Sequence, residues 1–258
     1  MARSDNHLVV GLTTFNHEFL GLSVPGLARA GKNVTLVIHN DNPCHKLTHR
    51  AIRRMGFRGN THIINSDENV GAIRARIAIM DYIKSNKISA PWIMFANDDD
   101  IVLDTVPPTP DNSIFAVLGN AVVVRSRLLD VLRVMANPKD FTIDGADTQL
   151  LAPRIALSGT FVRMDIMTEF CGFLSDTVSA VMDIVSDIPF VVPTDLIMWN
   201  MLVEYMRISH SDMSPIYMNQ MNYLMTKLNN SRYPSVLQRD SIVSRATALV
   251  SAALRGNE

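Results

Sequence analysis

Three consecutive carboxylates, Asp98, Asp99 and Asp100, are the residues of this sequence most suited to chemistry. They follow an apolar stretch at residues 92–96 that is typical of a buried strand. Adjacent carboxylates repel one another, and Mg²⁺ or Mn²⁺ relieves this repulsion by binding carboxylate oxygens together with substrate phosphates. The run therefore predicts a metal site made of Asp98, Asp99 and Asp100. The alternative interpretation is a solvated acidic loop.

Polar residues also follow three earlier apolar stretches. Thr14, Phe15 and Asn16 follow the first stretch, and Asp41 follows the second. Such residues favour turns, but four clusters at the carboxyl edge of one parallel sheet indicate a binding cleft. A carboxylate at Asp41 is suited to accept hydrogen bonds from a base edge or a ribose, or to close a turn.

The third polar cluster leads into a predicted helix through Asn69 and Gly71. Glycine allows the backbone to approach a ligand, and the start of a helix offers free N–H groups to anions. Arg74 and Arg76 fall in the first two turns, within reach of a diphosphate. The alternative for each arginine is a solvated position on the helix face.

Other site chemistries have little support. The sequence has neither a Walker motif nor a three-glycine dinucleotide fingerprint. His45 and His49 are four residues apart, but a zinc pair would need a third ligand and usually a nearby Glu. Cys44 and Cys171 are too few for a disulfide framework. A reducing, cytoplasmic location is therefore expected.

These residues need a framework that alternates strands with helices. Strands are predicted at residues 8–13, 34–39, 61–64 and 92–96, with helices at 17–30, 43–55 and 70–83 between them. The alternation predicts an α/β fold with a mostly parallel central sheet flanked by helices. Further on, strands are predicted at 113–124 and 155–162, and helices at 126–135, 195–206 and 234–254. The last of these is amphipathic and predicts a helical C-terminal extension.

Length and composition fit a folded protein with a sizeable core. The chain has 258 residues, of which 47% are hydrophobic. With 24 Lys and Arg against 25 Asp and Glu, the formal charge of −1 argues against a strongly basic nucleic-acid protein but leaves local basic patches open. No apolar stretch approaches the roughly 18 residues of a membrane span.

In their order along the chain, these motifs resemble those of family 2 glycosyltransferases, which have the GT-A (nucleotide-diphospho-sugar transferase) fold. Residues 13–16 resemble the family's Pro-Thr-Tyr-Asn, residues 40–42 its Asp-Asp-x-Ser turn, residues 69–77 its Asn-x-Gly-x-x-x-Ala-Arg-Asn, and residues 97–101 its Asp-x-Asp-Asp-Ile. Residues 159–165 with 171–173 are similar to its acceptor-side Gly, Arg and Gly-Gly-Phe motif. Asp195 stands at the position of the Asp in the family's Glu-Asp pair. Departures at Thr13, Asn40, Asn97, Cys171 and Thr194 mark a divergent member.

The resemblance implies a single GT-A type domain at residues 1–207, with a nucleotide-binding half at about 1–105 and an acceptor-side half at about 106–207. Residues 208–258 would be the helical extension. It also implies transfer of a sugar from a nucleoside-diphosphate sugar, with a UDP-sugar expected, and Mn²⁺ or Mg²⁺ as the cofactor. Asp195 would be the general base of an inverting reaction. The nucleotide would be bound by Thr14, Phe15, Asn16, Asp41, Asn69, Gly71, Arg76 and Asp98.

Two alternatives stay open at this point. One is a non-catalytic protein that binds sugar nucleotides, which the motif departures favour. The other is a glycosyltransferase acting on modified DNA bases, because from Lys227 onward five basic residues face two acids. Other acceptors that fit the family are glycans, lipid-linked molecules and proteins.

Overall fold

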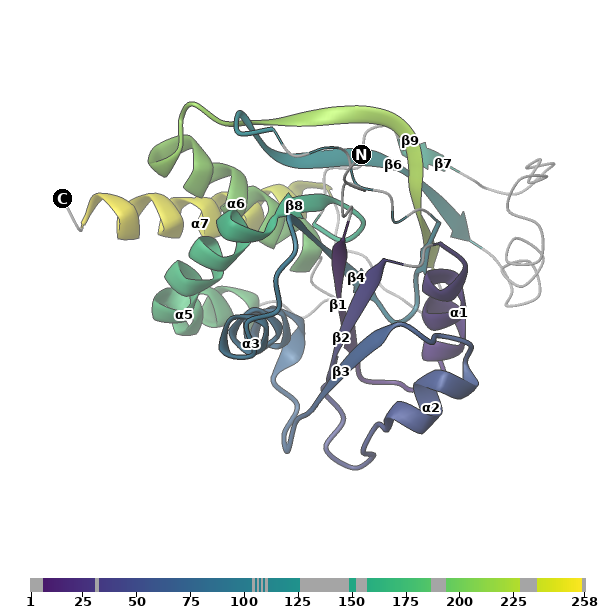
Figure 1. Cartoon of the computed structure of the whole chain (residues 1–258). Coiled ribbons are helices and arrows are strands. Elements are labelled where there is room, and N and C mark those ends of the chain that lie inside the picture. The colour runs from purple at the N-terminus through teal and green to yellow at the C-terminus, as the bar shows by residue number, and fades with distance from the viewer. Residues whose placement is uncertain are drawn as a thin grey trace.

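A computed structural model describes residues 7–30, 33–103, 105, 107, 109, 111–125, 149–151, 157–186, 194–227 and 236–256. Its strands are β1 (Leu8–Thr14), β2 (Val34–Asn40), β3 (Asn60–Asn65), β4 (Trp92–Asn97), β5 (Ile101–Val102), β6 (Ile114–Arg125), β7 (Gln149–Leu151), β8 (Phe161–Arg163) and β9 (Ser214–Lys227). Its helices are α1 (Leu20–Ala30), α2 (His49–Arg54), α3 (Gly71–Ser85), α5 (Met164–Ser186), α6 (Thr194–Ser209) and α7 (Val236–Arg255). Within these residues all the strands belong to one sheet, and the predicted α/β class is confirmed (Figure 1).

The first half of the sheet is parallel, as the alternating pattern predicts. Its strands lie in the order β3-β2-β1-β4, and every neighbouring pair is parallel. All four predicted strands are present, each one or two residues longer than predicted. Parallel pairing brings the carboxyl ends of β1 and β4 together, with Thr13 in register with Asn97. The acidic run and the Thr14 cluster therefore lie at the same edge.

Two of the predicted helices begin later than their apolar pattern indicates. Residues before α1 form a turn in which the Glu18 N–H donates to Asn16 Oδ1 at 3.1 Å. Before α2, the chain is held as a loop up to Thr48, whose side chain accepts from the Ala51 N–H as the N-cap. At both places, hydrogen bonds from side chains to the nearby backbone compete with helix formation. The spacing of the apolar residues does not predict these hydrogen bonds.

Beyond β4 the sheet becomes mixed. β8 pairs antiparallel with β4 and β6, and β6 pairs parallel with β9. Within the described part of the strand predicted at 155–162, which starts at residue 157, only Phe161 and Val162 belong to a strand, β8 (Phe161–Arg163). Residues 157–160 form a turn in which Gly159 has φ of 80°. The helix predicted at 126–135 lies outside the described residues.

The C-terminal stretch contributes a strand as well as the predicted helix. α7 confirms the helix predicted at 234–254, and it packs on α5 and α6. β9 was not predicted, and it continues the sheet between β6 and β5. The expectation of a purely helical extension is therefore corrected, because pairing with a distant strand, rather than a local alternation, makes residues 214–227 a strand. The domain boundary at residue 207 stays a prediction.

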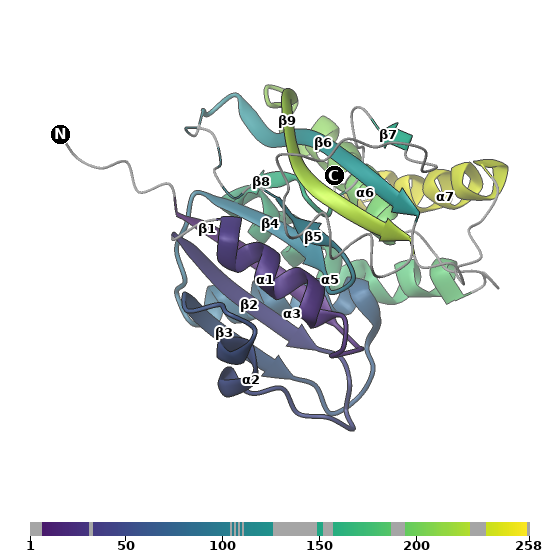
Figure 2. The ribbon, with the colours of Figure 1, turned by 90° about the vertical axis from the view of Figure 1, so that its right-hand side faces the viewer.

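Two apolar layers cover the sheet. Leu8, Val10 and Leu12 of β1 point to the side that α1 and α2 cover, while Val9 points to the side of α3, α5, α6 and α7. Figure 2 shows α1 in front of the parallel strands, with α2 beside β3 at the margin of the molecule. Among the described helices, none is long and apolar enough to cross a bilayer.

Candidate functional site

Asp98 is held against the end of β1. Its Oδ2 atom accepts hydrogen bonds from Thr14 Oγ1 at 2.7 Å and from the Phe15 N–H at 3.2 Å. Burial raises the pKa of Asp98, and these hydrogen bonds oppose the increase because they stabilise the ionised form. The structure thus brings together Thr14, Phe15 and Asp98, three of the residues that the sequence assigns to the nucleotide.

Arg76 lies inside the protein rather than at a nucleotide-facing surface. It is 0% exposed and forms an ion pair with Asp195. Its guanidinium also donates to Asn97 Oδ1 at 3.0 Å and to Ser158 Oγ at 3.2 Å. The expectation that Arg76 contacts a nucleotide is therefore corrected to a role beneath the site, because burying a charge requires a countercharge, and Asp195 supplies it.

Asp195 is bound by side chains from three other elements. It lies in the first turn of α6, with its side chain 15% exposed. Besides Arg76, its Oδ1 accepts from Ser158 Oγ at 2.8 Å and its Oδ2 from Asn97 Nδ2 at 3.1 Å. The carboxylate is therefore fixed in place and faces solvent over only a small part of its surface.

Asn97 joins Asp195 to the acidic run. Its Nδ2 atom donates to Asp100 Oδ2 at 3.0 Å as well as to Asp195. The site prediction omitted Asn97 and Ser158. The position of Asn97 at the end of β4 was a usable signal. Ser158 had no local signal, because it reaches the site through the turn in which the Gly159 N–H donates to the Phe95 carbonyl at 2.9 Å.

Several carboxylates gather at the site. Asp99 lies close enough to Asp98, Asp100 and Asp195 for their charges to act on it, and Asp195 pairs with Arg76. Burial raises the pKa of Asp99 to about 8, and the charges of Asp100, Asp98 and Asp195 add to the increase. A cation bound at these carboxylates would reduce the repulsion among them.

The carboxylate oxygens of Asp98, Asp99 and Asp100 are the atoms that the acidic run offers to Mg²⁺ or Mn²⁺. Carboxylate oxygens are suitable ligands for both ions. Among the described residues, no group of three or more His, Cys, Asp or Glu side chains is arranged to hold a metal by itself. Mg²⁺ usually takes only one or two carboxylates and completes its coordination with water and substrate phosphates. The acidic run fits that shared kind of site.

Asp41 occupies the start of α3. Its two carboxylate oxygens accept from the Val70 N–H at 2.8 Å and the Gly71 N–H at 2.9 Å. Asn69 Oδ1 also accepts from Gly71 N at 3.2 Å, and Gly71 adopts φ of 79°, which favours glycine. The backbone donors expected to bind an anion are therefore already paired with Asp41. The prediction that Asp41 binds a base or ribose requires that it do so while capping this helix.

Phe15 and Asn16 are exposed beside Asp98. Phe15 is 51% exposed, and the residue's carbonyl accepts from Asn42 Nδ2 at 2.9 Å, which ties this loop to the loop after β2. An exposed aromatic ring next to a carboxylate is suited to stack on a base. That Phe15 and Asn16 contact a nucleotide stays a prediction.

The acceptor-side motif has a different setting from the one that the resemblance implies. Cys171, Gly172 and Phe173 lie in the middle of α5, with Cys171 buried in the core. An apolar helix face accounts for Cys171 and Phe173 without reference to a ligand.

The structure is an α/β arrangement whose parallel half ends in an acidic run. No family model matches the sequence, and no curated protein matches it. One similar solved structure is the mannosyltransferase PcManGT from Pyrobaculum calidifontis in complex with GDP-Man and Mn2+, at 11% identity and a TM-score of 0.45. The match covers 97% of this chain and 74% of that chain. A likeness at this level assigns no substrate or activity here.

Proposed function

We propose that this chain is a metal-dependent glycosyltransferase that moves a sugar from a nucleoside-diphosphate sugar to an acceptor hydroxyl. One observation carries the proposal: Asn97 links the acidic run at the end of β4 to Asp195 on α6. Carboxylates suited to a metal-diphosphate donor and a carboxylate suited to proton transfer therefore adjoin one another. Inverting sugar transfer uses both kinds of group.

The donor would bind over the ends of β1 and β4. The exposed ring of Phe15 offers a stacking surface for the base, and Asp98 stands beside it for the ribose or the metal. Asp98, Asp99 and Asp100 supply the oxygen ligands for Mn²⁺ or Mg²⁺. A bound ion would act as a Lewis acid toward the donor and would offset the charge of the departing diphosphate. UDP is the nucleotide we expect.

Asp195 would take the proton. The acceptor hydroxyl gives its proton to the Asp195 carboxylate as its oxygen forms a bond to the anomeric carbon. The bond from that carbon to the diphosphate oxygen breaks, and its electron pair leaves with the nucleoside diphosphate. Attack from the face opposite the leaving group inverts the anomeric centre. Arg76, Asn97 and Ser158 would be positioning residues, which act through the Asp195 carboxylate that they hold.

A second candidate function has its own observation. Both oxygens of Asp195 accept hydrogen bonds inside the protein, and one of them pairs with a buried guanidinium. A carboxylate used in this way can serve purely to neutralise Arg76. The chain would then bind sugar nucleotides without transferring the sugar.

Transfer and donor binding distinguish these functions. We expect a UDP-sugar to bind by calorimetry in the presence of Mn²⁺, and to be hydrolysed or transferred slowly by the wild-type protein. Asp195→Asn should retain UDP binding, which also reports correct folding, while turnover falls at least about 100-fold because a general base is lost. Asp176→Asn, an exposed acid on α5, serves as the matched control and should have wild-type turnover.

Three results would contradict the proposal. If no nucleoside diphosphate binds in the presence of metal, the donor assignment fails. If the nucleotide binds but no sugar nucleotide turns over, the second candidate replaces the first. Near-normal turnover in Asp195→Asn would leave Asp195 only the task of neutralising Arg76.

A further inference from the structure

The most basic part of the sequence has no role in the proposed transfer reaction. Between Asp41 and Asp67 the chain contains no acidic residue, but it has five of the 24 lysines and arginines. These are Lys46, Arg50, Arg53, Arg54 and Arg58. The chain as a whole carries a formal charge of −1, so this stretch is a strong local departure. It forms the loop before α2, α2 itself and the turn into β3.

The arginines of this stretch are exposed and close together. Arg50, Arg53 and Arg54 are exposed, and their spacing of three and four residues places them on neighbouring positions of α2. Arg58 is exposed in the turn that follows. In the part of the chain that the structure describes, none of the four has an ion-pair partner. We call these four residues the α2 arginine surface.

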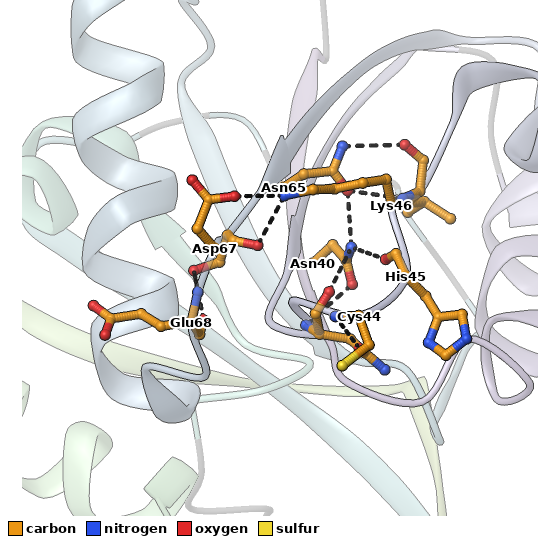
Figure 3. Close-up of polar contacts among 10 residues, drawn as sticks. Asn40, Cys44, His45, Lys46, Asn65, Asp67 and Glu68 are labelled. Carbon is orange, nitrogen blue, oxygen red and sulfur yellow. Dashed lines mark hydrogen bonds and ion pairs between the residues drawn. The ribbon is translucent and has the colours of Figure 1, made fainter.

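A buried amide network holds the loop that leads into this surface. Asn40 is 0% exposed, and its Nδ2 donates to the His45 carbonyl at 2.7 Å and to Asn65 Oδ1 at 2.8 Å (Figure 3). Asn65 also binds Leu47, accepting from its N–H at 2.7 Å and donating to its carbonyl at 3.1 Å. The loop is thereby tied at His45 and Leu47 to the ends of β2 and β3, just before α2 begins.

One cation of the stretch is already neutralised. Lys46 pairs with Asp67 at 2.6 Å across the two loops shown in Figure 3. The four arginines of the α2 arginine surface have no such ion pair among the described residues. Their like charges repel one another unless an anion binds. Guanidinium groups form paired hydrogen bonds with phosphate oxygens.

The surroundings of the surface separate two kinds of polyanion. Binding to a lipid bilayer usually combines basic residues with exposed apolar side chains that enter the membrane. Here the apolar residue of α2, Ile52, is 0% exposed and packs in the core. The large exposed hydrophobic residues of the described chain are Phe15 and Tyr217, neither of which lies in this stretch. A charged surface without apolar anchors suits a phosphodiester backbone in water.

We propose that the α2 arginine surface binds the phosphate backbone of a nucleic acid. The arginines would contact phosphates without reading sequence, as positioning contacts do. The proposal is independent of the transfer reaction, since none of these arginines belongs to the candidate site.

The experiment measures binding of a fluorescein-labelled DNA duplex of about 20 base pairs by anisotropy, at salt concentrations from about 50 to about 200 mM. The full-length protein is compared with the variant Arg50→Gln/Arg53→Gln/Arg54→Gln. We expect at least about tenfold weaker binding at low salt and a salt slope smaller by about 2 to 3, because each phosphate contact contributes about 0.9. The matched control is Arg29→Gln/Lys84→Gln/Arg255→Gln, which removes the same charge from exposed positions on α1, α3 and α7.

Binding of UDP with Mn²⁺ by each variant gives a separate readout of folding and of the candidate site. The proposal is overturned if the wild-type protein does not bind the duplex at low salt, or if the control variant loses as much affinity as the α2 variant. It is also overturned if phosphatidylserine vesicles bind and the duplex does not, which would assign the surface to a membrane. If the wild-type protein binds the duplex but does not bind UDP, the proposed function is contradicted and the nucleic-acid proposal is not.

Discussion

The guanidinium of Arg76 on α3 forms an ion pair with the carboxylate of Asp195 on α6, across a sequence separation of 119 residues. Arg76 is fully buried, and Asp195 is partly buried, with its side chain 15% exposed. A buried pair of this kind makes each partner dependent on the other, because removing one leaves an uncompensated charge away from water. The pair therefore links the folding of α3 and α6 to the geometry of the candidate site.

The first prediction concerns the stability of this pair. Asp195→Asn leaves the buried guanidinium of Arg76 without its countercharge, so we expect a loss in the free energy of unfolding on the order of 3 kcal/mol. The double variant Arg76→Met/Asp195→Asn should be more stable than Asp195→Asn, because it has no buried unpaired charge. Urea unfolding measures both. Arg207→Met, which breaks an exposed pair with Glu204, is the control and should have little effect. Equal unfolding midpoints for wild type and Asp195→Asn would contradict the prediction.

The second prediction is a pH dependence caused by Asp99. Its pKa is about 8 in the folded protein against an ordinary value of 3.8, so the folded state retains this proton where the unfolded state loses it. Stability should therefore fall as pH rises from about 4 to about 8 and then level off. Asp99→Asn removes this contribution, and its stability advantage over wild type should grow across that window. Urea unfolding without divalent metal at several pH values tests this, and an advantage independent of pH would refute it.

The third prediction concerns donor recognition by Phe15. If the base stacks on this exposed ring, Phe15→Ala should weaken UDP binding by roughly 5- to 150-fold, since stacking of a base on an aromatic ring is worth about 1–3 kcal/mol. Tyr217 is exposed to a similar extent, at 44% against 51% for Phe15, and it lies on β9. Tyr217→Ala is therefore the matched control and should bind UDP as wild type does. Calorimetry measures both variants, and equal affinities would exclude stacking on Phe15.

The fourth prediction concerns the two cysteines. Cys44 is exposed, whereas Cys171 is buried in α5, and burial raises the pKa of its thiol. Only the thiolate reacts with Ellman's reagent, so we expect one thiol to react quickly in the native protein and the second only after unfolding. Cys44→Ser should abolish the fast phase, and Cys171→Ser should leave it intact. Two fast thiols in the native protein would show that α5 does not shield Cys171 as described.

The parallel half of the sheet, and the edge at which polar residues collect, can be predicted from the amino-acid sequence. Runs such as residues 34–39 and 92–96 are apolar enough to predict buried strands, and α/β alternation then places their carboxyl ends together. The pairing of Thr14 with Asp98 follows from that register. These conclusions depend on local hydrophobic pattern and on connection rules, both of which can be read directly from the chain.

The contacts of several of these residues depend instead on how distant elements pack together. The position of Arg76 near the start of a helix is typical of a solvated or phosphate-binding arginine. Packing of α3 against α6 instead buries Arg76 and turns it toward Asp195. Ser158 and β9 likewise acquire their places from partners far along the chain. Hydrophobic periodicity records which face of an element is buried, whereas the partner of a buried charge depends on how separate elements pack. That information is not local, so the sequence pattern does not contain it.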